Sequence, residues 1–163
     1  MTAPRSLGYD KIRDREILFL SLDALTTPFT LPTIIGRQFV CFCAMDAAQF
    51  GVKEISQFCG HLVRLGCAYL STWGVDCERV HDIMDEIIVG DNPPETDIGC
   101  LMTTWHAKDS LEEALEFFMF CTIPDEAYAP QGCEVGLIIT IGSDTWAPAI
   151  ERFVTECVHP ASE

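Results

Sequence analysis

The sequence predicts an α/β fold, a three-layer sandwich around a mostly parallel, five-stranded sheet of the flavodoxin-like or Rossmann-like kind. Two observations predict it. Five short runs consist almost entirely of apolar residues, and segments with helical periodicity follow most of them. Strands without polar residues are buried on both faces, as in parallel sheets that helices cover. The alternation of strands and helices indicates the same architecture.

These patterns give five strands and four helices. The expected strands lie at 17–22, 39–45, 67–72, 100–104 and 135–141. Apolar residues at helical spacing place the helices around 55–65, 80–88, 111–119 and 149–157. Gly66 and Gly90 end the first two helices, and Ser110 with Glu113 forms a capping box before the third. The connection at 26–36 contains two prolines, and the sequence does not establish a helix there.

Length and composition fit one folded domain, residues 1–163, in which residues 1–16 could form a loosely ordered N-terminal arm. Apolar residues make up 48% of the chain and charged residues 21%, which argues against disorder. The apolar stretches are shorter than the ~20 residues that cross a bilayer. No apolar segment follows a basic N-terminus, so we expect no signal peptide, no membrane partner and a cytoplasmic protein.

The nine cysteines indicate a reducing compartment. Their number is odd, and most fall within apolar runs, where free thiols behave as small hydrophobic groups. Cys41 and Cys43 share one face of an expected strand and are interpreted as core. We expect neither a metal nor a cofactor.

The formal charge of −15 argues against binding to nucleic acid. The charge is also uneven, since residues 81–130 contain twelve carboxylates and one basic residue, Lys108. An acidic flank of this kind provides solubility or attracts a basic protein partner. The sequence leaves a homo-oligomer open.

Unusual residues follow the expected strands, at the ends where ligands bind in open parallel sheets. The candidate ligand-binding residues are Asp46, Ser71, Trp73, Asp76, Thr104, Trp105, His106, Ser143, Asp144 and Trp146. All three tryptophans are among them, one after each of three strands. Three indole rings at one rim predict an aromatic-walled pocket for a small polar or aromatic ligand. The alternative interpretation is that the rings cover the top of the core.

A catalytic interpretation centres on Cys77. Asp76 is a good N-cap residue, which would place Cys77 in the first turn of a helix, where the dipole favours thiolate. His81 follows four residues later, and His106 lies on the next rim segment, so a Cys–His nucleophile shaped by Asp76 and Asp144 is conceivable. A zinc site from Cys77, His81 and His106 lacks a fourth ligand. The sequence contains no dinucleotide-binding, P-loop or hydrolase-elbow motif.

Two motifs carry a family resemblance. W-G-V-D-C stands at 73–77, and T-T-W-H at 103–106 is followed by S-L-E-E at 110–113. This middle part of the chain resembles an uncharacterised bacterial family known only as a domain of unknown function. The resemblance implies no reaction and assigns no catalytic residue.

The leading hypothesis is a non-enzymatic binding or regulatory domain that acts through the strand-end rim and the acidic flank. One alternative is a small enzyme with a Cys/His/Asp site at the same rim. A second alternative is an acidic partner or immunity-like protein that binds a basic protein.

Overall fold

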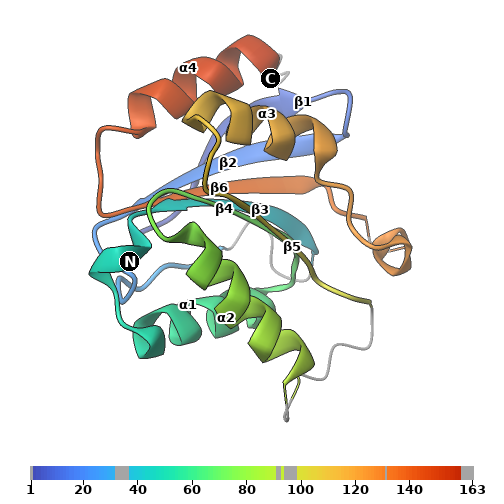
Figure 1. Ribbon diagram of the computed structural model, residues 1–163. Helices are drawn as coiled ribbons and strands as arrows, with labels where there is room; N and C mark the ends of the chain where they lie inside the picture. Colours follow the sequence, from blue (N-terminus) through green and yellow to red (C-terminus); the bar gives the residue numbers. More distant parts are fainter. Residues whose placement is uncertain (1, 32–36, 91–92, 94–98, 131, 159–163) are drawn as a thin grey trace.

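The computed structural model describes residues 2–31, 37–90, 93, 99–130 and 132–158. Six strands form one sheet, and four α-helices cover its two faces (Figure 1). The strands are β1 (Arg5–Asp10), β2 (Arg15–Leu22), β3 (Phe39–Met45), β4 (Cys67–Trp73), β5 (Met102–His106) and β6 (Val135–Ile141). The helices are α1 (Val52–Leu65), α2 (Cys77–Val89), α3 (Leu111–Cys121) and α4 (Ala147–Cys157). Short 3₁₀ turns occupy Ala47–Gln49 and Glu126–Tyr128.

The strand order is β1-β2-β6-β3-β4-β5. The last five strands in this order are parallel to one another, which confirms the predicted parallel sheet, and β1 is antiparallel to β2. The sheet therefore has six strands, not the predicted five. β1 was not predicted because its sequence, RSLGYD, has no apolar run and its register shifts between Ser6 and Gly8. It lies within the segment that the sequence allowed to be a loose arm.

The sheet separates two hydrophobic cores, as the three-layer prediction requires. Figure 1 shows it edge-on, with α3 and α4 on one side and α1 and α2 on the other. The α1/α2 core includes Leu20, Cys41, Leu62 and Met84, and the α3/α4 core includes Phe19, Phe42, Phe118 and Val154. Among the parallel strands the chain order is 1-5-2-3-4. This differs from the flavodoxin order 2-1-3-4-5 and from the Rossmann order 3-2-1-4-5-6.

Two predicted helix signals, Gly66 and the capping box at Ser110, are confirmed. Gly66 has φ 99° and donates its N–H to the carbonyl oxygens of Leu62 and Val63, which closes α1. Ser110 Oγ accepts from the N–H of Glu113 at 3.2 Å, and Glu113 Oε2 accepts from the N–H of Ser110 at 2.7 Å. This reciprocal pair satisfies two orphan donors at the start of α3.

The connection between β2 and β3 packs on the α1 side of the sheet. Its residues 23–31 contain no α-helix, and Leu25, Phe29 and Leu31 are buried in the α1/α2 core. Residues 32–36, with Pro32, lie outside the described residues.

All nine cysteines are free thiols. Five are buried, namely Cys41, Cys43, Cys59, Cys67 and Cys77. The expectation of buried thiols is wrong for Cys100 and Cys121, which are exposed at the margins of β5 and α3. Among the described residues, no helix combines the length and the apolar character needed to cross a membrane.

Candidate functional site at the strand ends

The carboxyl ends of the five parallel strands lie along one edge of the sheet. Beyond this edge the chain turns toward the α1/α2 side after β2, β3 and β4, and toward the α3/α4 side after β5 and β6. Neighbouring strands whose continuations diverge leave a crevice between them, which is where open α/β sheets bind ligands. The strand order produces three such places, at β2/β6, β6/β3 and β4/β5.

Each of these places holds a hollow. The hollow at β6/β3 has a volume of about 210 Å³ and is lined by Asp46, Gln49, Phe50, Ile141, Gly142, Ser143 and Trp146. The hollow at β4/β5 has about 260 Å³ and is lined by Trp73, Gly74, Val75, His106, Ala107, Asp109 and Trp146. The hollow at β2/β6 is smaller, about 140 Å³, and includes Asp144. Trp146 lines the first two hollows.

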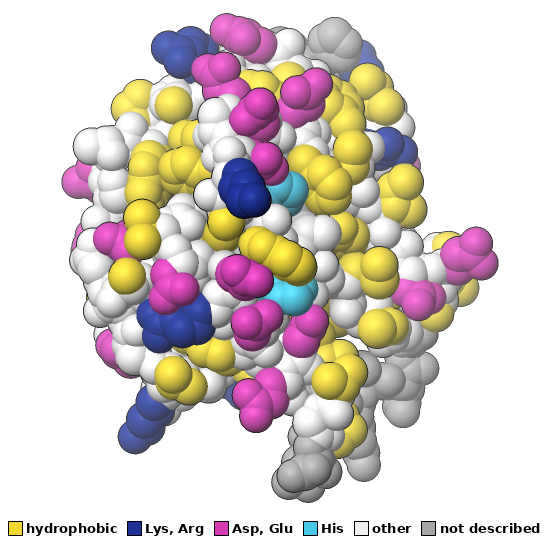
Figure 2. All heavy atoms as spheres, in the orientation of Figure 1, with side chains coloured by type: hydrophobic (Ala, Val, Ile, Leu, Met, Phe, Trp, Pro, Cys, Tyr) yellow, Lys and Arg dark blue, Asp and Glu magenta, His cyan; other side chains and the backbone are white. Residues whose placement is uncertain are grey.

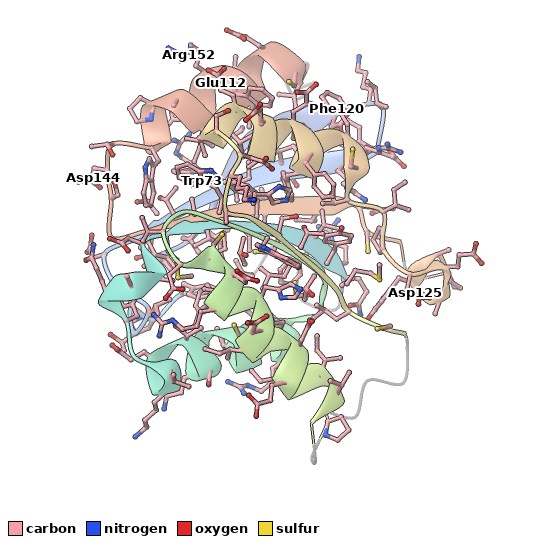
Figure 3. The ribbon with its side chains drawn as sticks, in the orientation of Figure 1. Trp73, Glu112, Phe120, Asp125, Asp144 and Arg152 are labelled. Carbon is pink, nitrogen blue, oxygen red and sulfur yellow. The ribbon has the colours of Figure 1, made fainter. Side chains whose placement is uncertain are left out.

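Trp73 and Trp146 lie against each other, as the sequence predicted. Their ring centroids are 5.4 Å apart, and the rings meet edge to face at 84°. Trp73 ends β4 on the α3/α4 side of the sheet and donates its indole N–H to the carbonyl oxygen of Asp109 at 2.9 Å (Figure 3). Trp146 is the residue before the first turn of α4, and its indole N–H has no partner among the described residues.

Trp105 does not join them, so the prediction of three rings at one rim is wrong. β5 runs to His106 rather than ending at residue 104, and Trp105 therefore lies inside the strand. Its side chain points to the α2 side, where its ring centroid is 4.3 Å from that of His81. Successive side chains of a strand point to opposite faces, so this parity places Trp105 across the sheet from Trp73 and Trp146.

Asp46 gives the β6/β3 hollow a carboxylate. It follows β3 directly and accepts hydrogen bonds from the N–H of Ala48 at 3.2 Å and from Gln49 Nε2 at 2.8 Å. On the other wall, Ser143 Oγ lies 2.8 Å from Thr145 Oγ1. Asp144, next along the loop, is exposed and lies at the same end of the sheet (Figure 3).

His106 is buried at the end of β5 within a chain of polar side chains. Its Nδ1 lies 2.7 Å from Asp109 Oδ2, and its Nε2 lies 3.4 Å from Thr104 Oγ1. Thr104 Oγ1 lies 3.1 Å from Ser71 Oγ. Ser71 is buried beneath the rim and Thr104 is half-buried, and the two hydroxyl groups connect β4 to His106. Asp109 was not among the predicted residues, although its position three residues after His106 was readable in the sequence.

The environment of Cys77 contradicts the predicted thiolate. Its exposed fraction is 0%, and burial raises the pKa of its thiol despite the position in the first turn of α2. Asp76 adopts a left-handed backbone, φ 58°, and makes no side-chain cap. Its carboxylate instead accepts from Arg79 Nε at 2.7 Å. His81 contacts Asp82 and Asp85 rather than the thiol.

Two glycines shape the rim, and sequence reasoning did not identify them as such. Gly74 has φ 115°, and a Cβ there would lie 2.1 Å from the carbonyl oxygen of Met45. Gly142 has φ 73° and lines two of the hollows. Each of these glycines directly follows a strand. A glycine at such a position is the sequence feature that could have indicated a turn with positive φ. Within the described part of the chain, no group of three or more His, Cys, Asp or Glu residues could hold a metal ion.

Two larger hollows, each about 360 Å³, lie elsewhere. One is between the β2–β3 connection and α1, and the other is at the opposite end of the sheet near Asp125 (Figure 3). The second contains Arg13 and Arg15, but both guanidinium groups donate to backbone carbonyls at the end of α3. These hydrogen bonds tie both side chains to the fold, although Arg13 Nε is buried without a hydrogen-bond partner among the described residues. The three hollows that gather at the strand ends make that edge the stronger candidate for a site.

Comparison with known proteins identifies the family. No curated protein and no solved structure matches the chain. A family model described as a domain of unknown function, DUF7684, matches residues 17–157. The match runs from β2 to the end of α4, so it contains the five parallel strands, both tryptophan motifs and every hollow at the strand ends. The chain therefore belongs to the DUF7684 family, whose shared domain has no assigned function.

Proposed function

We propose that this domain binds a small polar ligand with a planar or apolar face at the strand-end edge, without transforming it. The observation that carries the proposal is the position of Trp146, which forms a wall of both the β6/β3 and the β4/β5 hollow and has an unpaired indole N–H among the described residues. An aromatic wall with a few convergent polar groups is the usual form of a small-molecule site.

The polar groups suggest which ligand fits. Asp46 and Gln49 offer a carboxylate and an amide at one side of the β6/β3 hollow, and Ser143 offers a hydroxyl at the other. A carboxylate selects hydrogen-bond donors, and the overall charge of −15 disfavours anions. The matching ligand is an amine or a polyhydroxyl compound whose flat face rests on Trp146.

The buried thiol supports binding over catalysis. A nucleophile must reach its substrate, and Cys77 is fully buried with a raised pKa. His106 has both ring nitrogens within reach of protein side chains, which suits a positioning role at the floor of the β4/β5 hollow.

The test is a thermal-shift screen of amines, sugars and nucleosides, followed by calorimetric titration of each compound that raises the melting temperature. We expect Trp146→Leu and Asp46→Asn each to weaken binding roughly tenfold, because the first removes the aromatic wall of the hollow and the second removes the charge that attracts a donor. Trp105→Leu is the matched control, since its ring lies on the other face of the sheet. Loss of affinity in the Trp105 variant equal to that in the Trp146 variant would overturn the proposal, as would a screen without any hit.

A further inference from the structure

We propose a second binding surface, distinct from the strand ends. The outer edge of β5, with Trp105 beside it, takes up an extended, positively charged segment of another protein as an added strand. Main-chain hydrogen bonds provide affinity in this mode, and side chains beside the edge provide specificity.

The edge is unpaired within the described part of the chain. β5 is the last strand in the sheet, and β4 is its only partner there. The carbonyl oxygen of Thr104 points toward β4, where it accepts from Thr72 Oγ1 at 3.3 Å. Because backbone groups alternate in direction along a strand, the N–H and C=O groups of Thr103 and Trp105 point outward.

β5 is a short strand, but it lacks three other features that protect sheet edges. Proteins blunt an edge strand with a bulge, a proline or a lysine. The opposite edge, β1, has such a bulge between Ser6 and Gly8 and begins with Arg5. β5 has the sequence MTTWH, with neither a proline nor a lysine, and it pairs with β4 without a register shift.

Apolar side chains lie exposed beside this edge. Trp105 is 45% exposed and Met102 is 42% exposed. The indole ring rests on His81, whose Nδ1 is 3.0 Å from Asp82 Oδ1 and whose Nε2 is 3.4 Å from Asp85 Oδ2. Asp85 also accepts from Thr103 Oγ1 at 2.5 Å. These contacts hold the exposed ring in place, and a fixed, accessible tryptophan is typical of interface anchors.

The charges on both sides of the edge select the partner. Acidic side chains gather on the face that carries α2 and α3 (Figure 2). On α2 they are Glu78, Asp82, Asp85 and Glu86, and around the start of α3 they are Asp109, Glu112, Glu113 and Glu116. The basic residue of α2, Arg79, is paired with Asp76 and directed toward the β3–α1 turn. A strand beside β5 would thus lie between two acidic helices.

This charge favours a basic partner over a second copy of the chain. Pairing of two β5 edges would bring both acidic helices of one copy against those of the other, and like charges at close range oppose association. A segment that alternates Lys or Arg with apolar residues satisfies both features, since its apolar side chains meet Trp105 and its cations meet the carboxylates.

The experiment measures binding of fluorescein-labelled ten-residue peptides by fluorescence anisotropy. The probe alternates arginine and valine, one control alternates glutamate and valine, and a second control keeps the arginines but replaces alternate valines by proline. We expect binding of the first peptide alone, weakened at about 0.3 M NaCl because salt screens the charges. Equal binding of the proline peptide would show that no strand is added and would overturn the proposal.

Variants locate the surface. Trp105→Thr and Asp82→Asn should each weaken the arginine peptide several-fold, and Thr103→Pro should abolish binding because its outward N–H is lost. Glu156→Gln is the charge control, since it removes one exposed carboxylate of α4, which packs against β1 at the opposite edge of the sheet. Circular dichroism verifies that each variant is folded. Equal loss in the Glu156 variant, or a concentration-dependent dimer that Trp105→Thr dissolves while no peptide binds, contradicts the inference.

Discussion

The rim of the candidate site depends on single residues where the backbone has little freedom. At Gly74 the chain leaves β4 so close to the end of β3 that no side chain fits. Arg79, in the first turn of α2, donates to the carbonyl oxygens of Ala47 and Phe50 and so fixes the turn that carries Asp46. The geometry of the hollows therefore follows from backbone contacts as well as from the side chains that line them.

Replacing Gly74 by alanine should destabilise the protein by about 3 kcal/mol or more, since φ 115° is unfavourable for alanine and its Cβ would overlap the Met45 carbonyl oxygen. Urea denaturation measures this change. Gly60→Ala is the matched control in the interior of α1, where the nearest atom is the end of Arg64 at 3.4 Å. That control should gain about 0.5–1 kcal/mol. Similar stabilities of the two variants would contradict the proposed turn.

The thiols should differ sharply in reactivity. Cys100 and Cys121 are exposed, whereas Cys77 is fully buried with a raised pKa. A chromogenic disulfide reagent at neutral pH should therefore label Cys100 and Cys121 rapidly and label Cys77 only after addition of denaturant. Peptide mass spectrometry identifies the labelled sites. Rapid native labelling of Cys77 would restore the enzymatic alternative.

At the level of elements, the sequence was sufficient where hydrophobic burial determines the structure. Unbroken apolar runs identified β2, β3, β4 and β6, and a shorter apolar stretch at 100–102 indicated β5. Gly66 and the Ser110 capping box located two helix ends. The start and end of β5 were misplaced by two residues, because its half-exposed sequence, MTTWH, carries no apolar run. That shift was enough to misplace Trp105, since its face depends on its position within the strand. β1 escaped prediction because its sequence, RSLGYD, contains no apolar run and its pairing with β2 is interrupted by a register shift.

The last turn of α3 contains no basic side chain that could donate to its free carbonyl groups. Arg15, from β2, takes this role. Arg15 donates to the carbonyl oxygen of Thr122 at 2.9 Å, to Thr122 Oγ1 at 3.2 Å and to the carbonyl oxygen of Cys133 at 3.1 Å. Arg15→Met leaves these buried acceptors unpaired and should cost about 3 kcal/mol, measured by urea denaturation. Arg152→Met, which removes an exposed side chain 3.8 Å from Glu112, should change stability by less than about 0.5 kcal/mol. Equal effects would refute the capping role.

At the scale of the whole molecule, the two proposed binding surfaces lie at different places on the sheet. The strand-end hollows open along one edge of the sheet, and the acidic helices flank β5 at its side. A ligand at Trp146 and a peptide at Trp105 would therefore bind without overlap. The sequence indicated both the tryptophans and the acidic segment. It could not show that Trp105 lies apart from Trp73 and Trp146, because this depends on the strand order and on the position of Trp105 within β5.

The α1/α2 core contains four thiols that must stay protonated in the folded protein, namely Cys41, Cys43, Cys59 and Cys67. Burial raises the pKa of each, to about 12 for Cys59, whereas an unfolded chain ionises its thiols near pH 8.5. Below that pH both states are protonated and stability does not depend on these groups. Above it the unfolded state loses protons that the folded state keeps, so the free energy of unfolding should fall as pH rises.

Each such thiol contributes a slope that approaches about −1.4 kcal/mol per pH unit once the unfolded-state thiol is ionised, near pH 10, and that persists up to the folded-state pKa. The double variant Cys41→Ala/Cys43→Ala removes two of them and should reduce the steepness by about 2.7 kcal/mol per pH unit. Urea denaturation from pH 7 to 10, in a reducing buffer, measures both slopes. Because the alanine variant also loses packing at every pH, the comparison rests on the slopes and not on the absolute stabilities. Parallel curves for the two proteins would show that the thiols of β3 are not held protonated by the core.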